Sequence, residues 1–232
     1  MRVGGAVPTL TTPPTVNPDE LEYSGSAFAL LTAGGETSDG TLSYMAIKSE
    51  TLPEMPGTND PGWVDPYTSL TATDAGDYYI YVKITGDATH ADKVFGPYGP
   101  SGLDSGPKTI SKAPATLTCS DTAPLSFTTA QGAGSTQEKT GVSCTGGTVT
   151  VSSGTPANCT VAFSEGTITV TRVSTEAFEN TVITVSVTPD SNHYWLSDNN
   201  VTFNVSAVKY SWLNGGQFNG FNHNGGNEQQ TW

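Results

Sequence analysis

A short pattern that occurs twice is the feature that most constrains the fold. Residues 82–90 read Val-Lys-Ile-Thr-Gly-Asp-Ala-Thr-His, and residues 185–193 read Val-Ser-Val-Thr-Pro-Asp-Ser-Asn-His. In each copy an alternating strand pattern runs into a Gly-Asp or Pro-Asp turn and a polar segment that ends on histidine, which predicts a β-hairpin. One copy in each half of a 232-residue chain predicts two tandem β-sandwich domains.

The composition agrees with an all-β chain. It includes 26 Gly and 15 Pro, whereas charged residues make up only 13% of the sequence, and no segment shows a convincing amphipathic helix pattern. We expect an extended leader over residues 1–12, a first sandwich over 13–113, a second over 114–209, and a short tail rich in Gly, Asn and aromatic residues over 210–232.

Individual strands follow from alternation and turn residues. In the first sandwich, residues 21–31 read as strand, tight turn and strand, followed by strands at 41–47, 78–85 and 108–113. In the second sandwich we expect strands at 115–119, 125–129, 148–152, 159–163, 166–173, 180–188 and 200–207.

Asp74-Ala75-Gly76-Asp77-Tyr78 is the most specific local motif. A D-x-G-x-Y run that enters an alternating strand is the tyrosine-corner signature of immunoglobulin-like sandwiches, in which the tyrosine hydroxyl bonds back to upstream backbone. We therefore assign Asp74, Gly76 and Tyr78 a structural role. Ile80 stands where antibody domains have a cysteine, so the core is expected to be apolar and without a disulfide.

The first domain resembles the bacterial immunoglobulin-like (Big/MBG-type) repeats of gut-bacterial surface proteins, which also occur in phage virion proteins. The blocks that carry the resemblance are residues 21–27, 31–34, 40–44, Trp63, 73–78, 81–83 and 86–90. The second domain is similar more loosely, through 167–173 and 185–207. The resemblance implies a β-sandwich module for display or adhesion, without shared catalytic residues. The insertion at residues 97–107 departs from the short connection of such domains.

Charge and the chain ends exclude several partners. The formal net charge is −13, from 22 acidic and 9 basic residues, and no Lys/Arg cluster exists to bind nucleic acid or an anionic membrane. Residues 1–8 do not read as a secretory signal, and no segment approaches the roughly 18–20 apolar residues of a membrane span. If Met1 is the native start, we expect the protein to stay in the cytoplasm until assembly or lysis.

Candidate chemistry is sparse. Cys119, Cys144 and Cys159 all lie in the second domain; a Cys144–Cys159 or Cys119–Cys144 bridge is open, and reduced thiols that pack as small hydrophobes are favoured. The histidines (His90, His193 and His223) are scattered in turns and the tail, and no hydrolase or metalloprotease motif appears. We expect no enzymatic activity, no cofactor and no catalytic or metal-binding residues.

Two sets of loop residues allow weaker hypotheses. Acidic and amide side chains in two loops could hold calcium, although such residues are ordinary in turns and the turn reading is favoured; they are Asn59, Asp60, Asp65, Asp190, Asp198 and Asn199. Four aromatic residues in or beside loops are candidates for surface recognition of a glycan, with packing beneath long loops as the favoured alternative; they are Trp63, Tyr67, Tyr194 and Trp195.

The tail is a candidate attachment segment. It is too short for a core of its own, yet it carries the aromatic residues Tyr210, Trp212, Phe218, Phe221 and Trp232. Burying one large apolar side chain is worth roughly 1.5–3 kcal/mol, so we expect the tail to dock onto a partner or a sister subunit. A disordered polar tail is the alternative.

The resemblance, together with the absence of a secretory signal in residues 1–8, implies a non-enzymatic structural protein of a tailed bacteriophage, and we expect a capsid-decoration or head-fibre subunit at the virion surface. The tail would bind a capsid or other virion protein, the chain could form a homo-oligomer, and the sandwiches would make weak contacts with mucus or host glycans. The alternatives are a bacterial cell-surface adhesin or a fragment of one, and a carbohydrate-binding module.

Overall fold

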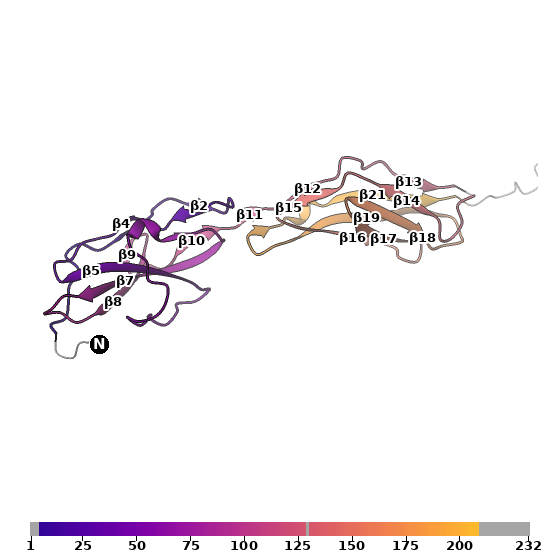
Figure 1. Cartoon of the computed structure of the whole chain (residues 1–232). Helices are drawn as coiled ribbons and strands as arrows, with labels where there is room; N and C mark the ends of the chain where they lie inside the picture. Colours follow the sequence, from indigo (N-terminus) through magenta and orange to yellow (C-terminus); the bar gives the residue numbers. More distant parts are fainter. Residues whose placement is uncertain (1–4, 129, 209–232) are drawn as a thin grey trace, which may run out of the picture.

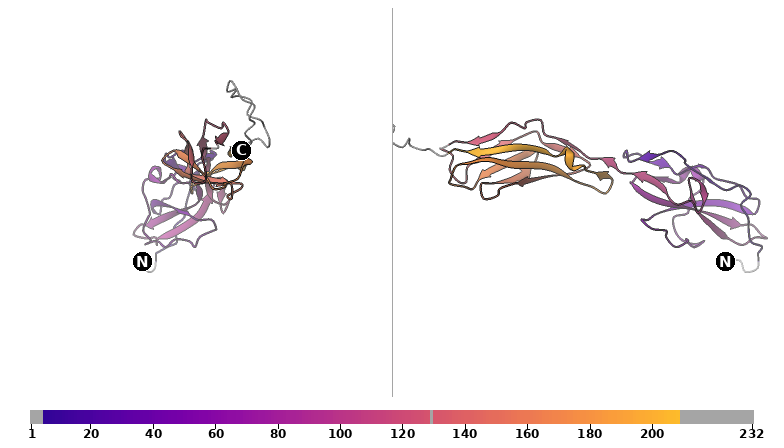
Figure 2. Two further views of the ribbon diagram at one scale, coloured as in Figure 1. Left: turned by 90° about the vertical axis from the view of Figure 1, so that its right-hand side faces the viewer. Right: turned by 180° about the vertical axis from the view of Figure 1, so that it is seen from behind.

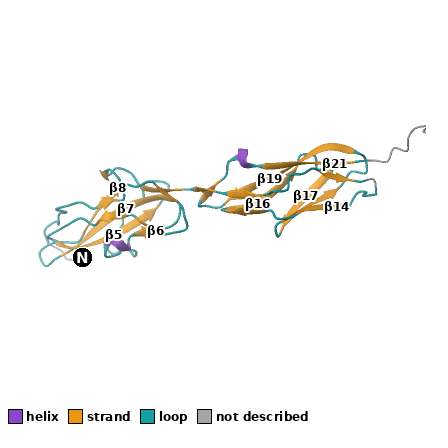
Figure 3. Ribbon diagram, turned by 90° about the horizontal axis from the view of Figure 1, so that it is seen from above, coloured by secondary structure: helices purple, strands orange, loops and turns teal. Residues whose placement is uncertain are grey.

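The computed structural model describes residues 5–128 and 130–208, and in this part of the chain the regular structure is almost entirely β-strand. The exceptions are two single-turn 3₁₀ helices, η1 (Tyr67–Ser69) and η2 (Ser197–Asn199) (Figure 3). Two β-sandwiches lie end to end (Figure 1), and the view from behind shows the same elongated arrangement (Figure 2). The expectation of an all-β chain with two tandem immunoglobulin-like domains is confirmed. No described helix is long and apolar enough to span a membrane.

Domain 1 is organised around one long central strand, β7 (Gly76–Gly86). It pairs along its length with β5 (Gly40–Lys48) on one side. On the other side it pairs with β8 (Lys93–Gly99) and β10 (Lys108–Ser111), and β10 pairs in parallel with β2 (Leu21–Glu22). Short antiparallel pairs complete the domain: β1 (Thr15–Val16) with β4 (Leu31–Ala33), and β3 (Phe28–Ala29) with β6 (Thr71–Ala72).

Residues 21–31 form strand, turn and strand as expected, with Gly25, at φ 77°, in the turn. The two strands do not pair with each other, because β2 joins the β7 sheet whereas β3 pairs with β6. The expected last strand is present as β10, but β8, which pairs with the same edge of β7 before the 97–107 insertion ends, was not predicted. The chain pairs with β7 as β8, leaves through the short strand β9 (Gly102–Leu103), and resumes on the same β7 edge as β10.

Strand β7 is buried on both faces. Tyr78, Ile80 and Val82 belong to the main core, as the alternation predicts. Tyr79 and Tyr81 point to the opposite face and are also buried, together with Met45 from β5. The long loop after β5 lies close to this second face: the Lys83 ammonium donates to the Thr58 carbonyl and stands 5.0 Å from the centre of the Trp63 ring.

The tyrosine-corner hydrogen bond is present. The Tyr78 hydroxyl donates to the Asp74 carbonyl oxygen over 2.7 Å, four residues upstream. Burial raises the pKa of the Tyr78 hydroxyl, with the nearby Asp74 carboxylate adding to the effect. Ile80 is completely buried behind it, in an apolar core without a disulfide.

We expect Tyr78→Phe to lower the free energy of unfolding of domain 1 by about 1 kcal/mol, because one buried hydrogen bond is lost while the ring packing is kept. Urea denaturation of the full chain measures the change. Tyr79→Phe is the matched control, because the Tyr79 hydroxyl has no hydrogen bond to any described residue. Equal losses in the two variants would contradict the role of the corner.

Domain 2 has two facing sheets. One contains β13 (Leu125–Phe127), β21 (Val201–Ala207), β19 (Phe178–Pro189) and β16 (Gly147–Ser153), in that order. The other contains β14 (Thr136–Lys139), β18 (Thr167–Arg172) and β17 (Cys159–Ser164). Two short pairs lie outside these sheets: β12 (Thr116–Thr118) with β15 (Ser143–Thr145), and β11 (Ala113–Pro114) with β20 (His193–Tyr194).

The two Lys and Arg residues in the described part of domain 2 are both buried. The Lys139 ammonium lies 2.9 Å from the Asp121 carboxylate, as an ion pair rather than an aligned hydrogen bond, and 5.0 Å from the centre of the Phe203 ring. Arg172 donates to four loop carbonyls, those of Gln131 (2.6 Å), Ser174 (2.8 Å), Glu176 (3.1 Å) and, at the longest distance, Thr175 (3.5 Å). The described surface of domain 2 therefore exposes no Lys or Arg.

The cysteines of domain 2 are free thiols. Cys159 is completely buried in the core, and the partly buried Cys119 packs against that core. Burial raises the pKa of both thiols. Cys144 is half-buried and donates weakly to the Gly147 carbonyl over 3.2 Å.

Candidate functional site at the ends of the domains

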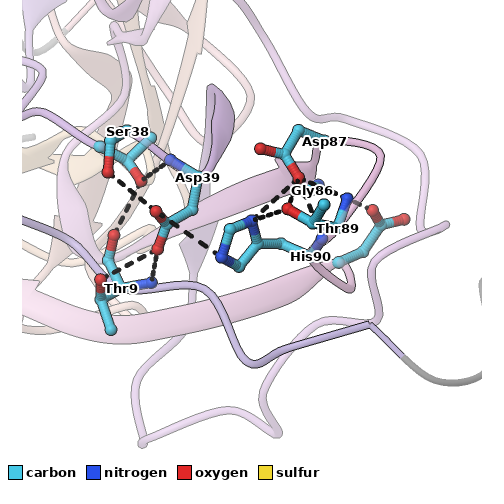
Figure 4. A network of polar contacts seen from close by, with 9 residues as sticks. Thr9, Ser38, Asp39, Gly86, Asp87, Thr89 and His90 are labelled. Atoms are coloured by element: carbon cyan, nitrogen blue, oxygen red, sulfur yellow. Dashed lines mark hydrogen bonds and ion pairs between the residues drawn. The ribbon is translucent and has the colours of Figure 1, made fainter.

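The repeated pattern folds into the same turn in both domains. In domain 1 the Asp87 carboxylate accepts the Thr89 backbone N–H over 2.7 Å and lies 2.9 Å from His90 Nδ1 (Figure 4). In domain 2 the Asp190 carboxylate accepts the Asn192 backbone N–H over 2.9 Å and lies 2.7 Å from His193 Nδ1. The strands that flank the turns pair with one another, β7 with β8 and β19 with β21, so the predicted hairpins are confirmed.

An upstream segment lies beside each turn in the same way. Ala6 forms a parallel bridge with His90, and its N–H donates to the Thr89 carbonyl over 2.8 Å. Ala113 pairs in parallel with His193, and its N–H donates to the Asn192 carbonyl over 3.1 Å. Each domain therefore has an end built from the same two parts, a leader segment and an Asp-x-x-His turn. The expected leader is not separate from domain 1, because residues 6–12 are hydrogen-bonded to it.

In domain 2 this end binds domain 1. The Asn192 side chain accepts the Ala75 backbone N–H over 2.9 Å and donates to the Asp74 carboxylate over 3.0 Å. The Tyr23 ring meets the His193 ring edge to face, with centroids 5.1 Å apart. The tyrosine-corner turn of domain 1 thus docks onto the repeated turn of domain 2. We call this set of contacts, together with the β11–β20 pair, the joint.

A glycine makes room for the joint. Gly146 has φ 75°, and a Cβ atom at this position would lie 2.4 Å from two carbon atoms of the His193 ring. Such a contact is impossible without displacement, and a positive φ disfavours other residues. The absence of a side chain at Gly146 therefore leaves room for the His193 ring in the orientation in which it contacts Tyr23.

At the matching end of domain 1, the residues of the turn contact other residues of domain 1. Asp39 takes the place of Gly146, since the backbone N–H of Asp87 donates to its carbonyl (3.1 Å) as that of Asp190 does to Gly146 (3.0 Å). The Asp39 carboxylate accepts the backbone N–H and the hydroxyl of Thr9 and lies 3.8 Å from His90 Nε2 (Figure 4). Thr89 takes the place of Asn192, and its hydroxyl donates to Asp87 over 2.8 Å.

The turn carboxylates hold lowered pKa values. At Asp87 the backbone N–H of Thr89 is the main cause, followed by the His90 side chain. At Asp190 the His193 side chain comes first and the Asn192 N–H second. Both groups are solvent-exposed, so the hydrogen bonds rather than burial set the shifts.

These shifts predict loss of stability in acid. An aspartate in the unfolded chain has a pKa near 3.9. When the pKa is lower in the folded state, the ionised carboxylate stabilises the fold at every pH above 3.9. This stabilisation is lost as the pH falls from 3.9 through the pKa of the folded state. We expect the urea midpoint to hold between about pH 7 and 5 and to decline below about pH 4. Asp190→Asn should make the decline shallower than in the wild type. Glu50→Gln controls for the loss of one negative charge; an equal change in slope would contradict the assignment.

The four candidate recognition aromatics are not brought together. Trp63 and Tyr67 belong to domain 1, whereas Tyr194 and Trp195 belong to domain 2. Both indoles hold their own loops, Trp63 through the Gly57 carbonyl (3.1 Å) and Trp195 through the Asn200 side chain (2.9 Å). Tyr194 is 40% exposed beside the joint.

Tyr67 lines a groove. Its ring stands edge-on to Tyr44, with centroids 6.3 Å apart. The groove, of about 670 Å³, is open and lined by polar and apolar groups in similar measure, with Glu36 and Asp65 among its lining residues. An aromatic ring beside carboxylates and hydroxyls can stack on and hydrogen-bond a sugar.

The remaining candidate residues take local roles. Asp60 caps the Gly57 N–H over 2.7 Å, and Asp190 holds its own turn. Among the described residues, no group of three or more His, Cys, Asp or Glu side chains is placed to hold a metal ion. The tail residues Tyr210, Trp212, Phe218, Phe221 and Trp232 lie outside the described part of the chain.

Comparisons with known proteins do not assign this chain to a family. The sequence matches no protein-family model and no curated protein. Among solved structures, the chain is similar to the titin domains Z1Z2 in complex with telethonin. The identity is 13%, the match covers 89% of this chain and 98% of that chain, and the TM-score is 0.37. This similarity is too low to support a conclusion about function.

Proposed function

We propose that this protein is a non-enzymatic structural protein that presents two immunoglobulin-like domains as one elongated arm. The joint is the observation that carries the proposal. Two hydrogen bonds from Asn192, an aromatic contact and a strand pair connect the domain ends. A protein that displays domains away from a surface needs such a connection, because the distance that it spans depends on the two domains staying end to end.

The chemistry of the turns supports a structural role. The described histidines each have Nδ1 beside the aspartate of the same turn. The Asn192 side chain of the domain 2 turn contacts domain 1. These polar groups are used in holding the fold and the joint.

We place the arm at the surface of a tailed bacteriophage virion, as a capsid-decoration or head-fibre subunit. The support is the resemblance of residues 13–113 to bacterial immunoglobulin-like repeats, together with the aromatic residues of the tail, which would bind a capsid protein. The described surface of domain 2, which exposes no basic side chain, would repel nucleic acid and anionic membranes. Weak glycan contacts would use the Tyr67 groove.

Deleting residues 210–232 tests the attachment. We expect the truncated protein to lose co-sedimentation with virions that lack their own copy, because the aromatic side chains of the tail would supply the buried apolar area. Thermal unfolding of the two domains should be unchanged, which controls for folding. Retained co-sedimentation would move the anchor to the amino-terminal end or a sandwich face. Binding of the intact protein to bacterial cells but to no virion component would favour a cell-surface adhesin.

A further inference from the structure

Strand β16 of domain 2 corresponds to strand β5 of domain 1. Each of them pairs antiparallel with the strand that runs into the repeated turn, β19 or β7. Gly40 in β5 and Gly147 in β16 pair with the same position of the repeated pattern. Four residues further along each strand, Tyr44 therefore corresponds to Val151. The two domains differ in what lies on the outer edge of these strands.

In domain 1 the outer edge of β5 is covered by the chain itself. Tyr44 donates its backbone N–H to the Val64 carbonyl over 2.9 Å and accepts the Val64 N–H over 2.8 Å. Val64 belongs to the long loop after β5, which returns along this edge as an isolated antiparallel bridge. The outward backbone groups of Tyr44 thus have an extended segment as their partner.

In domain 2 the same edge is open. The loop after β16 is short, residues 154–158, and leads directly into β17. Gly154 donates its N–H to the Val182 carbonyl of β19 over 2.9 Å. Because backbone groups alternate along an antiparallel strand, the even-numbered residues of β16 face β19, whereas Val149 and Val151 face outward. The outward N–H and C=O groups of these two valines bond to no described residue.

Strand β16 also lacks the features that keep an exposed edge strand from pairing. Such strands normally carry a charged residue, a proline or a bulge, yet residues 147–153 read Gly-Thr-Val-Thr-Val-Ser-Ser and pair with β19 in an unbroken register. The opposite edge of the same sheet is covered, because the Gln137 side chain donates to the Ser126 carbonyl of β13 over 2.7 Å.

The uncharged surface is wider than the strand. Residues 140–164, which include β16, its loop and β17, contain no Asp, Glu, Lys or Arg, although the formal net charge of the chain is −13. Two acidic copies of the chain repel each other wherever their carboxylates meet. At this edge they can approach without bringing like charges into contact.

We propose that β16 pairs with β16 of a second copy, antiparallel and about a twofold axis at Thr150, so that the sheet continues from one copy into the other. In this register Val149 lies opposite Val151 of the other copy, and each such pair exchanges both of its backbone hydrogen bonds. On the exposed face Thr150 lies opposite its own counterpart and Thr148 lies opposite Ser152. Pairs of hydroxyl side chains and pairs of β-branched side chains both stabilise antiparallel sheets.

The sequence of β16 favours a second copy over an unrelated strand. Residues 148–152, Thr-Val-Thr-Val-Ser, have nearly the same pattern in both directions. Antiparallel pairing with itself therefore places hydroxyl against hydroxyl and valine against valine at every position. The inference depends neither on the tail nor on a place in a virion.

Sedimentation equilibrium of the full chain tests the pairing. We expect a monomer–dimer equilibrium with a Kd of about 100 µM or tighter. Thr150→Lys should weaken it at least about tenfold, because two like charges would lie directly opposite each other. Thr202→Lys is the matched control: it adds the same charge at an exposed position of the same sheet, on β21, which β19 separates from β16. This control should dimerise as the wild type does, and thermal unfolding of both variants confirms that the domains are intact.

Thr150→Cys tests the register. Side chains opposite each other in a non-hydrogen-bonded pair have Cβ atoms roughly 4.5–5.5 Å apart, which a disulfide can bridge after a small shift. Mild oxidation should therefore link two copies of this variant into a covalent dimer. The wild type, whose free thiols are Cys119, Cys144 and Cys159, and Thr202→Cys should remain unlinked under the same conditions.

Deleting residues 210–232 should leave the dimer in place, which separates this interface from attachment through the tail. A chain that stays monomeric at about 500 µM would overturn the proposal and leave the edge to a strand of another protein. A dimer that survives Thr150→Lys, gives no covalent link in Thr150→Cys, or disappears with the tail would also overturn it.

Discussion

Replacing Arg172 with methionine should lower the free energy of unfolding of domain 2 by about 3 kcal/mol. Arg172 is 3% exposed, and its guanidinium donates to carbonyls of two different loops, that of Gln131 and those of residues 174–176. Methionine keeps the aliphatic volume but supplies no donor, so the carbonyls must find water or remain without partners. Hydrogen bonds to a charged group are each worth roughly 1.5–3 kcal/mol, and partial access of water to the loops reduces the sum.

Hydrogen exchange followed by mass spectrometry measures this effect, because it reports on each domain separately. Protection should fall throughout residues 116–207 and remain unchanged in domain 1. Arg172→Lys, which keeps the charge but offers a single donor head, should lose about half as much. Lys93→Met, on an exposed side chain, should stay within about 0.5 kcal/mol. A loss confined to the two loops would mean that Arg172 orders them without supporting the core.

Local signals explain why much of the fold could be predicted from the sequence. The tyrosine corner needs only a short motif, and the Tyr78–Asp74 bond spans four residues. Each repeated turn closes on its own aspartate, so the hairpins follow from residues close together in sequence. In strands with one buried face, such as β19, buried and exposed residues alternate. This alternation can be read from the sequence without knowing which strands pair with one another.

The errors arise where partners distant in sequence decide the structure. Strand β14 was not predicted, because its inward-facing residue is Lys139, which is buried through Asp121 and Phe203 rather than through apolar character. Strand β8 of domain 1 was not predicted either; it shares one edge of β7 with β10, across the 97–107 insertion.

The joint could not be predicted from either domain alone. Its contacts connect Tyr23 and Asp74 with residues of a turn more than a hundred positions away. A signal was nevertheless present in the repeat itself. The two copies differ where domain 1 has Thr89 and domain 2 has Asn192, and the longer side chain is the one that reaches across. Differences between copies of a repeat can thus mark the residues that act outside the repeat.

Asn192→Ala should loosen the joint while both domains remain folded. The substitution removes the bond from the Ala75 N–H and the bond to the Asp74 carboxylate. At roughly 0.5–1.5 kcal/mol for each bond, the ratio of undocked to docked molecules should rise about 5- to 150-fold. Small-angle X-ray scattering should show a broader distribution of interdomain distances and a smaller mean maximum dimension. The β11–β20 pair keeps the chain connected but cannot alone fix the angle between the domains.

Thr89→Ala is the matched control for this prediction. Thr89 occupies the same position of the repeated turn in domain 1, but its hydroxyl donates to Asp87 inside the turn. The variant should therefore leave the scattering curve of the full chain unchanged. Gly146→Ala should reproduce the effect of Asn192→Ala by another route, because the added methyl group displaces the His193 ring from Tyr23. An unchanged curve in both Asn192→Ala and Gly146→Ala would mean that the strand pair alone sets the arm, and the side-chain contacts of the joint would lose their proposed role.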